Sequence, residues 1–344
     1  MNKIKTKSRF FCIVAISMAI LVLVMILSLA LGSANISFKE SISAIFSDVP
    51  FLSDILNSDG LKDTTKNIVL NIRLPRILLA GVIGASLSVC GAIYQSVLKN
   101  SMADPYTLGV SSGAALGATI AIILNGVIDV KIMAFITAMF TAIIVYWLSL
   151  RISKRSSTAL ILMGINANFL ISAVISLLMI MNKDKMDKIV FWTMGSLATS
   201  TWTNLKVSLI TIIPMCLSFF FGRQLNAISF NEELAKSVGI NTAFIRKTMI
   251  VLVSVITAIC VSVSGIIGFV GLMLPHVIRF IFGGDYRYLL PLSAIYGAVF
   301  LIISDDIAKT AAMPSEIPIG IVTSLIGAPF LIYLIFRNFS KSKY

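Results

Sequence analysis

The feature that most constrains this chain is a series of long apolar segments, each bounded by charged residues, glycine or proline. A membrane-spanning helix needs about 20 mostly apolar residues. The 344-residue chain offers ten candidate segments: 10–32, 77–97, 107–124, 132–150, 158–181, 205–222, 248–264, 266–279, 288–304 and 318–336. The eighth is short and glycine-rich, which leaves the count at nine or ten. Because 58% of the residues are apolar and 12% are charged, a soluble protein is excluded. We predict an all-α polytopic membrane protein with a single transmembrane domain, residues 1–344.

The charged residues between these segments predict which side of the membrane each loop faces. If the N-terminus is cytoplasmic, the inner segments hold 17 of the 28 Lys and Arg residues and four of the 15 Asp and Glu residues. The whole net charge of +13 then lies on the inner face, as the positive-inside rule requires. This distribution favours ten spans with both termini cytoplasmic, and it accounts for the basic charge without nucleic acid as a partner. The first segment is too long for a signal peptide, so we expect it to be retained as a span.

Two connecting segments are long enough to form structure outside the membrane. The outer segment 33–76 contains an extracellular loop, 33–66, which we interpret as a lid over the extracellular end. The cytoplasmic region 223–247 contains Ser229 and Glu232 at capping-box spacing and Gly239 where a helix would end, which predicts a two-turn helix. A second short helix is expected from Thr242 into the seventh span. The first helix is either a plain connector or a docking element for a cytoplasmic partner.

Small residues recur at three- and four-residue spacing in the second and third spans. In the second span this face includes Gly84 and Gly91 and ends at Gln95, and in the third it includes Gly109 and Gly113. Small faces allow helices to approach closely in lipid. We assign both faces to helix packing, with a contribution to a translocation path as the alternative.

Several kinds of chemistry are missing from the sequence. There is no G-x-x-x-x-G-K-[ST] phosphate loop, so ATP with its Mg²⁺ would have to bind a partner, and no cofactor is expected in this chain. The single histidine, His276, has no metal-ligand spacing to Cys, Asp or Glu, so we interpret it as a packing or hydrogen-bonding residue and predict no metal site. The central stretches of the spans lack charge, which disfavours an ion-coupled secondary transporter and transport of a bare metal ion. We also find no nucleophile, base or metal cluster typical of a membrane-embedded enzyme.

Longer motifs carry a resemblance to a known family. They are Arg73-Leu-Pro-Arg76, the run from Gly84 to Gln95, Asn100-Ser-Met-Ala-Asp-Pro105, Leu108-Gly-Val-Ser-Ser-Gly-Ala114, Trp192-Thr-Met-Gly-Ser196, Glu233-Leu-Ala-Lys-Ser-Val-Gly239, Gly265-Ile-Ile-Gly-Phe-Val-Gly-Leu-Met-Leu-Pro-His-Val-Ile-Arg279, Glu316-Ile-Pro-Ile-Gly320 and Gly327-Ala-Pro329. From about Arg73 to Arg337 the chain resembles the permeases of iron-siderophore, haem and vitamin B12 ABC importers. It departs from them at Asn100-Ser101-Met102, where Asn-Pro-Leu is usual, and at Lys309, where arginine is usual.

The resemblance implies an assembly and a cargo. It implies a homodimer or heterodimer of ten-span permease subunits in the cell membrane, two cytoplasmic ATPase subunits and an extracytoplasmic substrate-binding protein. A ferric siderophore is the expected cargo, with haem and cobalamin as alternatives.

The same resemblance assigns roles to single positions. The expected ATPase-coupling residues are Glu232, Glu233, Leu234, Ala235 and Gly239. The expected binding-protein contacts, which the charge count places at the outer surface, are Arg73, Arg76 and Lys309. Ser157 and Thr158 match the position of a cytoplasmic gate, with capping of the fifth span as the alternative. Positions assigned to packing or to the translocation path further along the chain are Gly268, Gly271 and Pro275.

Overall fold

The structure, a computed structural model, describes residues 7–32, 34, 36–45, 47, 62–152 and 157–341. The helices among these residues are α1 (Lys7–Ala30), α2 (Phe38–Ile45), α4 (Asp63–Asn67), the π-helix η2 (Ile68–Arg73), α5 (Leu74–Val97), α6 (Val110–Ile123), α7 (Val130–Ile152), α8 (Ser157–Met181), the 3₁₀-helix η3 (Lys183–Lys185), α9 (Met186–Thr193), α10 (Trp202–Leu209), α11 (Ile212–Phe219), α12 (Gly222–Phe230), α13 (Glu232–Ser237), α14 (Thr242–Ser264), α15 (Val270–Phe282), α16 (Tyr286–Thr310) and α17 (Ile319–Lys341).

The ten predicted spans correspond to helices in the described residues. Seven helical stretches are long and apolar enough to cross a membrane: Ser8–Ala30, Asp63–Val97, Val130–Ile152, Ser157–Met181, Trp202–Phe219, Thr242–Ser264 and Tyr286–Thr310. Three shorter apolar helices, Val110–Ile123, Val270–Phe282 and Ile319–Leu334, fill the remaining positions. The short, glycine-rich eighth span is therefore a separate short helix, α15. The all-α, multi-pass fold predicted from the sequence is confirmed.

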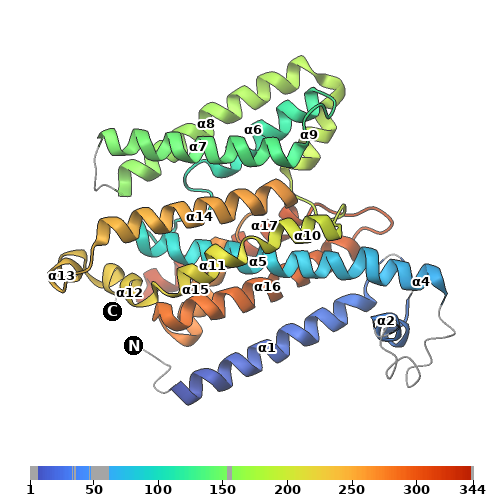
Figure 1. Ribbon diagram of the computed structural model, residues 1–344, viewed down its shortest axis with the longest axis horizontal. Coiled ribbons are helices and arrows are strands. Elements are labelled where there is room, and N and C mark those ends of the chain that lie inside the picture. The colour runs from blue at the N-terminus through green and yellow to red at the C-terminus, as the bar shows by residue number, and fades with distance from the viewer. Residues whose placement is uncertain are drawn as a thin grey trace.

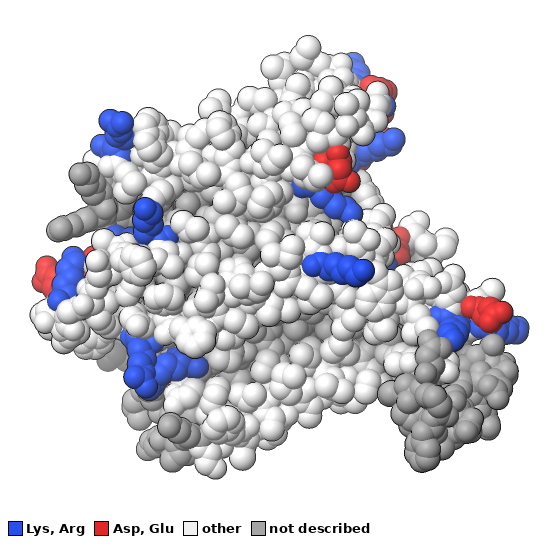
Figure 2. All heavy atoms as spheres, in the orientation of Figure 1, with Lys and Arg blue, Asp and Glu red and all other residues white. Residues whose placement is uncertain are grey.

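The long helices run side by side in layers (Figure 1). α5 lies at the centre and packs against α14, α15 and α16, while α1 covers α16 from outside and α6, α7 and α8 form a group beyond α14. α1 begins and the chain ends on the same side of the molecule as α12 and α13. Lys, Arg, Asp and Glu side chains lie mostly toward the two ends, with a wide uncharged band between them (Figure 2). This band is what a hydrocarbon layer about 30 Å thick requires.

The small face of α5 lets neighbouring backbones approach very closely. A Cβ at Gly84 would lie 2.3 Å from the Gly297 carbonyl oxygen of α16, and one at Gly91 would lie 1.7 Å from the Gly271 oxygen of α15. On α6, a Cβ at Gly113 would lie 2.4 Å from Thr141 Oγ1 of α7. These faces therefore pack helices within one subunit, because no larger side chain fits where they meet.

α6 and α15 are short, and each follows a non-helical segment. Segment 98–109 precedes α6 and segment 265–269 precedes α15, and the two segments meet. The Tyr106 hydroxyl donates to the Ile267 carbonyl at 2.8 Å and accepts from the Ile267 N–H at 3.2 Å. Irregular backbone at membrane depth must find such partners inside the protein. Gly109, with φ of +76°, then turns the chain into α6.

The extracellular loop 33–66 is described only in part. α2 begins with a capping box, since the Ser37 N–H donates to Glu40 Oε2 at 2.7 Å and the Glu40 N–H donates to Ser37 Oγ at 3.2 Å. α2 packs against the end of α1 and against α4. Residues 33, 35, 46 and 48–61 lie outside the described residues, so the lid stays a prediction.

Candidate functional site

The cytoplasmic helix predicted at 230–238 is present as α13, directly after α12. Its N-cap is Asn231, whose side chain accepts from the backbone N–H groups of Glu233 at 2.8 Å and Leu234 at 3.3 Å. The predicted capping box of Ser229 with Glu232 is wrong. Ser229 still belongs to α12, and its hydroxyl bonds to the Ser96 hydroxyl of α5 at 2.6 Å. Asn231 is therefore the residue with the extended backbone that a cap requires.

The other end of α13 forms a Schellman motif. The Gly239 N–H donates to the Lys236 carbonyl and the Ile240 N–H donates to the Ala235 carbonyl, both at 3.0 Å. Gly239 has φ of +82°, a conformation that glycine adopts without strain. Asn241 then caps α14, which runs from Thr242 as one continuous helix. The helix expected to run from Thr242 into the seventh span is therefore confirmed, and it forms the first turns of α14.

The exposed apolar surface of this region differs from the predicted contact set. Leu234 is 54% exposed, but Ala235 is only 2% exposed and faces the protein interior. Phe230 and Val238, four residues before and after Leu234, are also exposed large apolar side chains. The sequence analysis did not include Phe230 and Val238 among the contact residues. Their four-residue spacing from Leu234, in a segment expected to lie outside the membrane, could have indicated them. We call Phe230, Leu234 and Val238 the apolar knob.

Glu232 does not face outward from this helix but holds it in place. Its carboxylate pairs with Lys99 at 3.2 Å, Lys236 at 3.2 Å and Arg246 at 3.1 Å, and it accepts from the Thr242 hydroxyl at 3.3 Å. Burial raises the pKa of Glu232, but the Lys236 hydrogen bond and the charges of Arg246 and Lys99 outweigh it and lower the pKa to about 2. Glu232 therefore ties α13 to α14 and to segment 98–109.

Lys99 is held in an unusual backbone conformation at this junction. Its φ of +49° lies in the left-handed region, which is uncommon for a residue with a side chain. Such residues persist where surrounding contacts fix them, often at functional positions. The ion pair between Lys99 and Glu232 therefore links α13 to segment 98–109. The same segment also contacts α15, through Ser101 and His276.

Removing the Lys99 ammonium is expected to weaken the energetic coupling between α13 and the membrane helices, because the ion pair with Glu232 is lost. If the chain works with the ATPase subunits that its resemblance implies, ATP hydrolysis stimulated by cargo should fall about fivefold in Lys99→Met, the lower end of coupling between linked sites. Lys236→Met is the matched control, because it removes a pair with the same carboxylate that stays within α13. Equal loss in both variants would contradict this role, and Lys99→Arg should retain most of the coupling.

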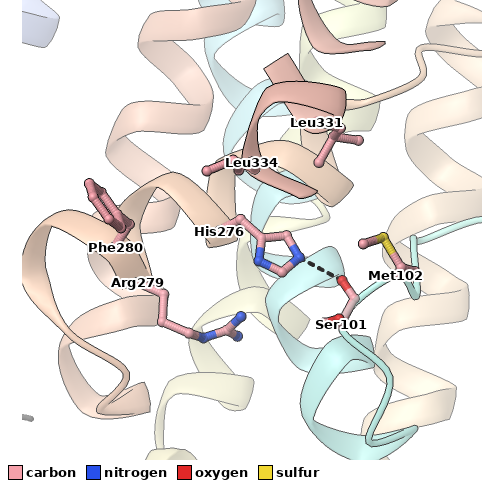
Figure 3. A pocket seen from close by; sticks show the side chains of 7 residues that line it. All are labelled: Ser101, Met102, His276, Arg279, Phe280, Leu331 and Leu334. Carbon is pink, nitrogen blue, oxygen red and sulfur yellow. Dashed lines mark hydrogen bonds between the residues drawn. The ribbon is translucent and has the colours of Figure 1, made fainter. Parts of the chain in front are cut away.

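Segment 98–109 is joined to α15 through the single histidine (Figure 3). A ring nitrogen of His276, Nε2, lies 2.6 Å from the Ser101 carbonyl oxygen. Below it, Arg279 donates to Gln95 Oε1 and to the Tyr286 hydroxyl, each at 3.2 Å. His276 and Arg279 line a cavity of about 220 Å³ with Met102 and residues of α17. The interpretation of His276 as a hydrogen-bonding residue is confirmed. Among the described residues, no three His, Cys, Asp or Glu side chains gather as metal ligands would.

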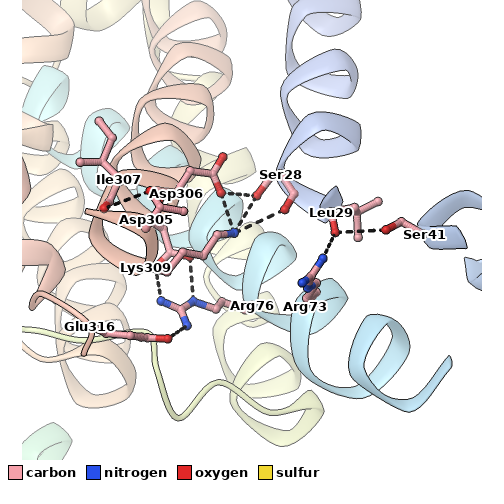
Figure 4. Close-up of polar contacts among 11 residues, drawn as sticks. Ser28, Leu29, Ser41, Arg73, Arg76, Asp305, Asp306, Ile307, Lys309 and Glu316 are labelled. Atoms are coloured by element: carbon pink, nitrogen blue, oxygen red, sulfur yellow. Dashed lines mark hydrogen bonds and ion pairs between the residues drawn. The ribbon is translucent and has the colours of Figure 1, made fainter. Parts of the chain in front are cut away.

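At the outer end, the three basic residues expected on the surface are buried (Figure 4). Arg76 makes a two-pronged contact with Asp305, with Nε at 2.8 Å and Nη2 at 2.9 Å, and reaches Glu316 at 2.9 Å. Lys309 pairs with Asp306 at 2.6 Å. The expectation that these side chains are exposed is wrong, because acidic partners hold Arg76 and Lys309 inside and backbone carbonyls hold Arg73.

The remaining members of this cluster attach α1 to the bundle. Arg73 donates to the carbonyl oxygens of Leu29 and Ala34, both at 2.6 Å. The Ser28 hydroxyl of α1 donates to Asp306 at 2.5 Å. Docking of a binding protein by Arg73, Arg76 and Lys309 stays a prediction, and it would require these internal contacts to open.

The predicted cytoplasmic gate lies at the start of α8. Ser157 and Thr158 are the first two residues of that helix, and Ser157 lines a cavity between α8, α7 and α14. Residues 153–156, which include the preceding Lys154 and Arg155, lie outside the described residues. The gate and the alternative capping role therefore both stay predictions.

Comparisons with known proteins agree over nearly the whole chain. The sequence model of the FecCD transport family matches residues 20–337. The hemin transport system permease protein HmuU of Yersinia pestis is 37% identical over 319 residues, covering 90% of this chain and 92% of that protein. An iron chelatin transport system permease protein of Helicobacter pylori is 38% identical over 275 residues, covering 79% and 83%. A solved structure described as an inward-facing conformation of a metal-chelate type ABC transporter matches with a TM-score of 0.81 at 31% identity, covering 94% of this chain and 99% of that one.

Proposed function

Because the chain belongs to the FecCD transport family, we propose that it carries a ferric siderophore or a related metal chelate into the cytoplasm. The chain is a multi-pass permease of the cell membrane and a subunit of an ABC importer for iron chelates, haem, vitamin B12 or similar cargo. Its partners therefore include an ATPase and a binding protein. The chain supplies the path, and ATP with Mg²⁺ would bind the ATPase.

One observation supports a chelate over a bare ion. The central turns of the described spans carry no Asp, Glu or Lys side chain, and the buried charged residues lie near the helix ends. A bare ferric ion would need oxygen or nitrogen ligands along its way. A metal already wrapped in an organic chelator brings its own ligands, so an uncharged path suffices. Relatives named for iron chelatin, hemin and cobalamin are all 37–38% identical to this chain, so the choice of a siderophore among these cargoes is decided by the experiment that follows.

Transport by the reconstituted complex tests this assignment. The permease, its ATPase and its binding protein would be placed in proteoliposomes and offered an iron-labelled hydroxamate siderophore, haem, cobalamin or unchelated ferric ion. We expect ATP-dependent uptake of the siderophore to exceed that of the other three by at least about tenfold, or ~1.4 kcal/mol in selectivity. ADP in place of ATP is the control. Faster uptake of haem or cobalamin would overturn the siderophore assignment.

We further propose that α13 docks into a groove of the ATPase, with the apolar knob as its anchor. Helices that bind in grooves rely on exposed apolar anchors, and Leu234 is such an anchor on α13, with exposed Phe230 at the end of α12 and exposed Val238 at the C-cap of α13. The knob lies outside the membrane, so lipid does not cover it. Each chain offers one such helix in its described residues. A transporter with two ATPase subunits would therefore need a second permease subunit to supply the second docking helix.

A further inference from the structure

A second cavity lies beside α13, at the cytoplasmic ends of α7, α8 and α14. Its volume is about 640 Å³. Its polar lining consists mainly of basic and hydroxyl side chains, and its apolar lining includes Leu150, Leu160 and Ile250. The basic and hydroxyl groups are Lys236, Arg246, Lys247, Tyr146, Ser149, Ser157 and Thr242. The apolar knob takes no part in this lining, so a ligand here would leave the knob free for the ATPase.

The charge of the cavity favours an anion. Glu232 is the single carboxylate among its described lining residues, and Lys99, Lys236 and Arg246 already share that carboxylate. Lys247 adds a further positive charge and is exposed. The surplus of cations over carboxylates means that a phosphate would meet ammonium and guanidinium groups together with hydroxyl donors.

The depth of the cavity places it among lipid headgroups. The last turns of α7 that line it also carry Trp147, which is exposed, and the Arg151 guanidinium lies 4.9 Å from the Trp147 ring centroid. Exposed tryptophan beside arginine at a helix end is typical of the membrane interface. Leu150, which is 37% exposed, offers apolar surface in the same lining as the cations. A ligand with a phosphate at one end and an acyl chain at the other would match both parts.

We propose that this cavity binds the phosphate headgroup of an anionic phospholipid from the inner leaflet. Basic pockets between membrane helices on the cytoplasmic side are suited to such headgroups. The headgroup would lie against Lys247 and Arg246 and the hydroxyls of Tyr146 and Ser157, because the Ser149 hydroxyl already donates to the Tyr146 carbonyl at 2.7 Å. Since Arg246 also holds Glu232, the bound lipid would contact the same network that fixes α13.

Native mass spectrometry of the delipidated full-length permease tests the proposal with phosphatidylglycerol as the probe and phosphatidylcholine as the neutral comparison. We expect selective retention of phosphatidylglycerol, and about fivefold weaker retention in Lys247→Gln, because one lysine near an anionic headgroup contributes about that factor. Lys206→Gln removes an exposed lysine of α10 and is the matched control. Lys247→Arg should retain binding, which separates lost charge from misfolding.

Three results would overturn the lipid site. Equal retention of the two lipids by the wild-type chain would remove the selectivity on which it rests. Equal retention of phosphatidylglycerol by Lys247→Gln and the wild type would place the lipid elsewhere. Lys247-dependent binding of inorganic phosphate to the chain in phosphatidylcholine nanodiscs, without preference for phosphatidylglycerol, would identify a site for a soluble anion instead.

Discussion

Leu234→Asp is expected to abolish copurification of the ATPase with the permease and to stop ATP-driven uptake. Leu234 is the central residue of the apolar knob and is 54% exposed, so a carboxylate there remains hydrated in the free permease and the chain still folds. In the complex, the same carboxylate would be buried in an apolar groove without a partner. Loss of a central anchor of this kind costs about 2 kcal/mol or more, a factor of about 30 or greater in affinity.

The neighbouring positions provide the controls for this experiment. Ser237→Ala changes an exposed side chain of the same helix that is not among the expected coupling residues, so it should leave the complex intact. Ala235→Asp is unsuitable as a docking test, because Ala235 is 2% exposed and a buried carboxylate would damage the fold itself. An intact complex with full uptake in Leu234→Asp would contradict docking through α13. Loss of uptake with the ATPase still bound would mean that the apolar knob couples ATP hydrolysis to uptake but is not needed to bind the ATPase.

The spans could be predicted from sequence, but the cap of α13 could not. Apolar segments bounded by charge are a local signal, and the distribution of lysine and arginine gives their orientation. At α13 the sequence offers Ser229 and Asn231, which are both good caps. The choice depends on where α12 ends, and Ser229 is held in α12 by a hydrogen bond to Ser96, 133 positions earlier. No local pattern contains that information.

The helix starts of the third and eighth spans could not be predicted from local sequence either. A run of apolar residues predicted the third span from 107 and the eighth from 266, whereas α6 begins at Val110 and α15 at Val270. In segment 265–269, Tyr106 satisfies both backbone groups of Ile267, so this residue does not need helical hydrogen bonds. Hydropathy measures whether a residue suits lipid, not whether its backbone is helical.

Charge counting did not predict the environment of the outer basic residues. It predicted exposed side chains at Arg73, Arg76 and Lys309, and the structure buries all three. The sequence separation of 229 positions between Arg76 and Asp305 hides their pairing. Because these side chains are buried, the effect expected from mutating them changes from slower association with a binding protein to loss of stability.

Arg76→Ala is accordingly expected to destabilise the permease by about 3–5 kcal/mol, the usual effect of removing one partner of a buried ion pair. Asp305, which is 2% exposed, would be left as a buried carboxylate without its two-pronged partner. Thermal unfolding followed by size-exclusion chromatography in detergent would measure the loss. Glu316→Gln removes only the 37% exposed partner of Arg76, so it should cost less than about 1 kcal/mol.

The double variant Arg76→Met with Asp305→Leu decides between a structural and a docking role. Replacing both members of a buried pair by apolar side chains of similar size removes the unpaired charge, so we expect it to recover most of the stability that Arg76→Ala loses. The double variant should then also recover transport, because the pair holds α5 to α16 and touches no cargo. If instead Arg76→Ala unfolds at the wild-type temperature while the binding protein associates more slowly, the buried cluster opens during docking. The sequence-based assignment of Arg76 as a docking contact would then be correct.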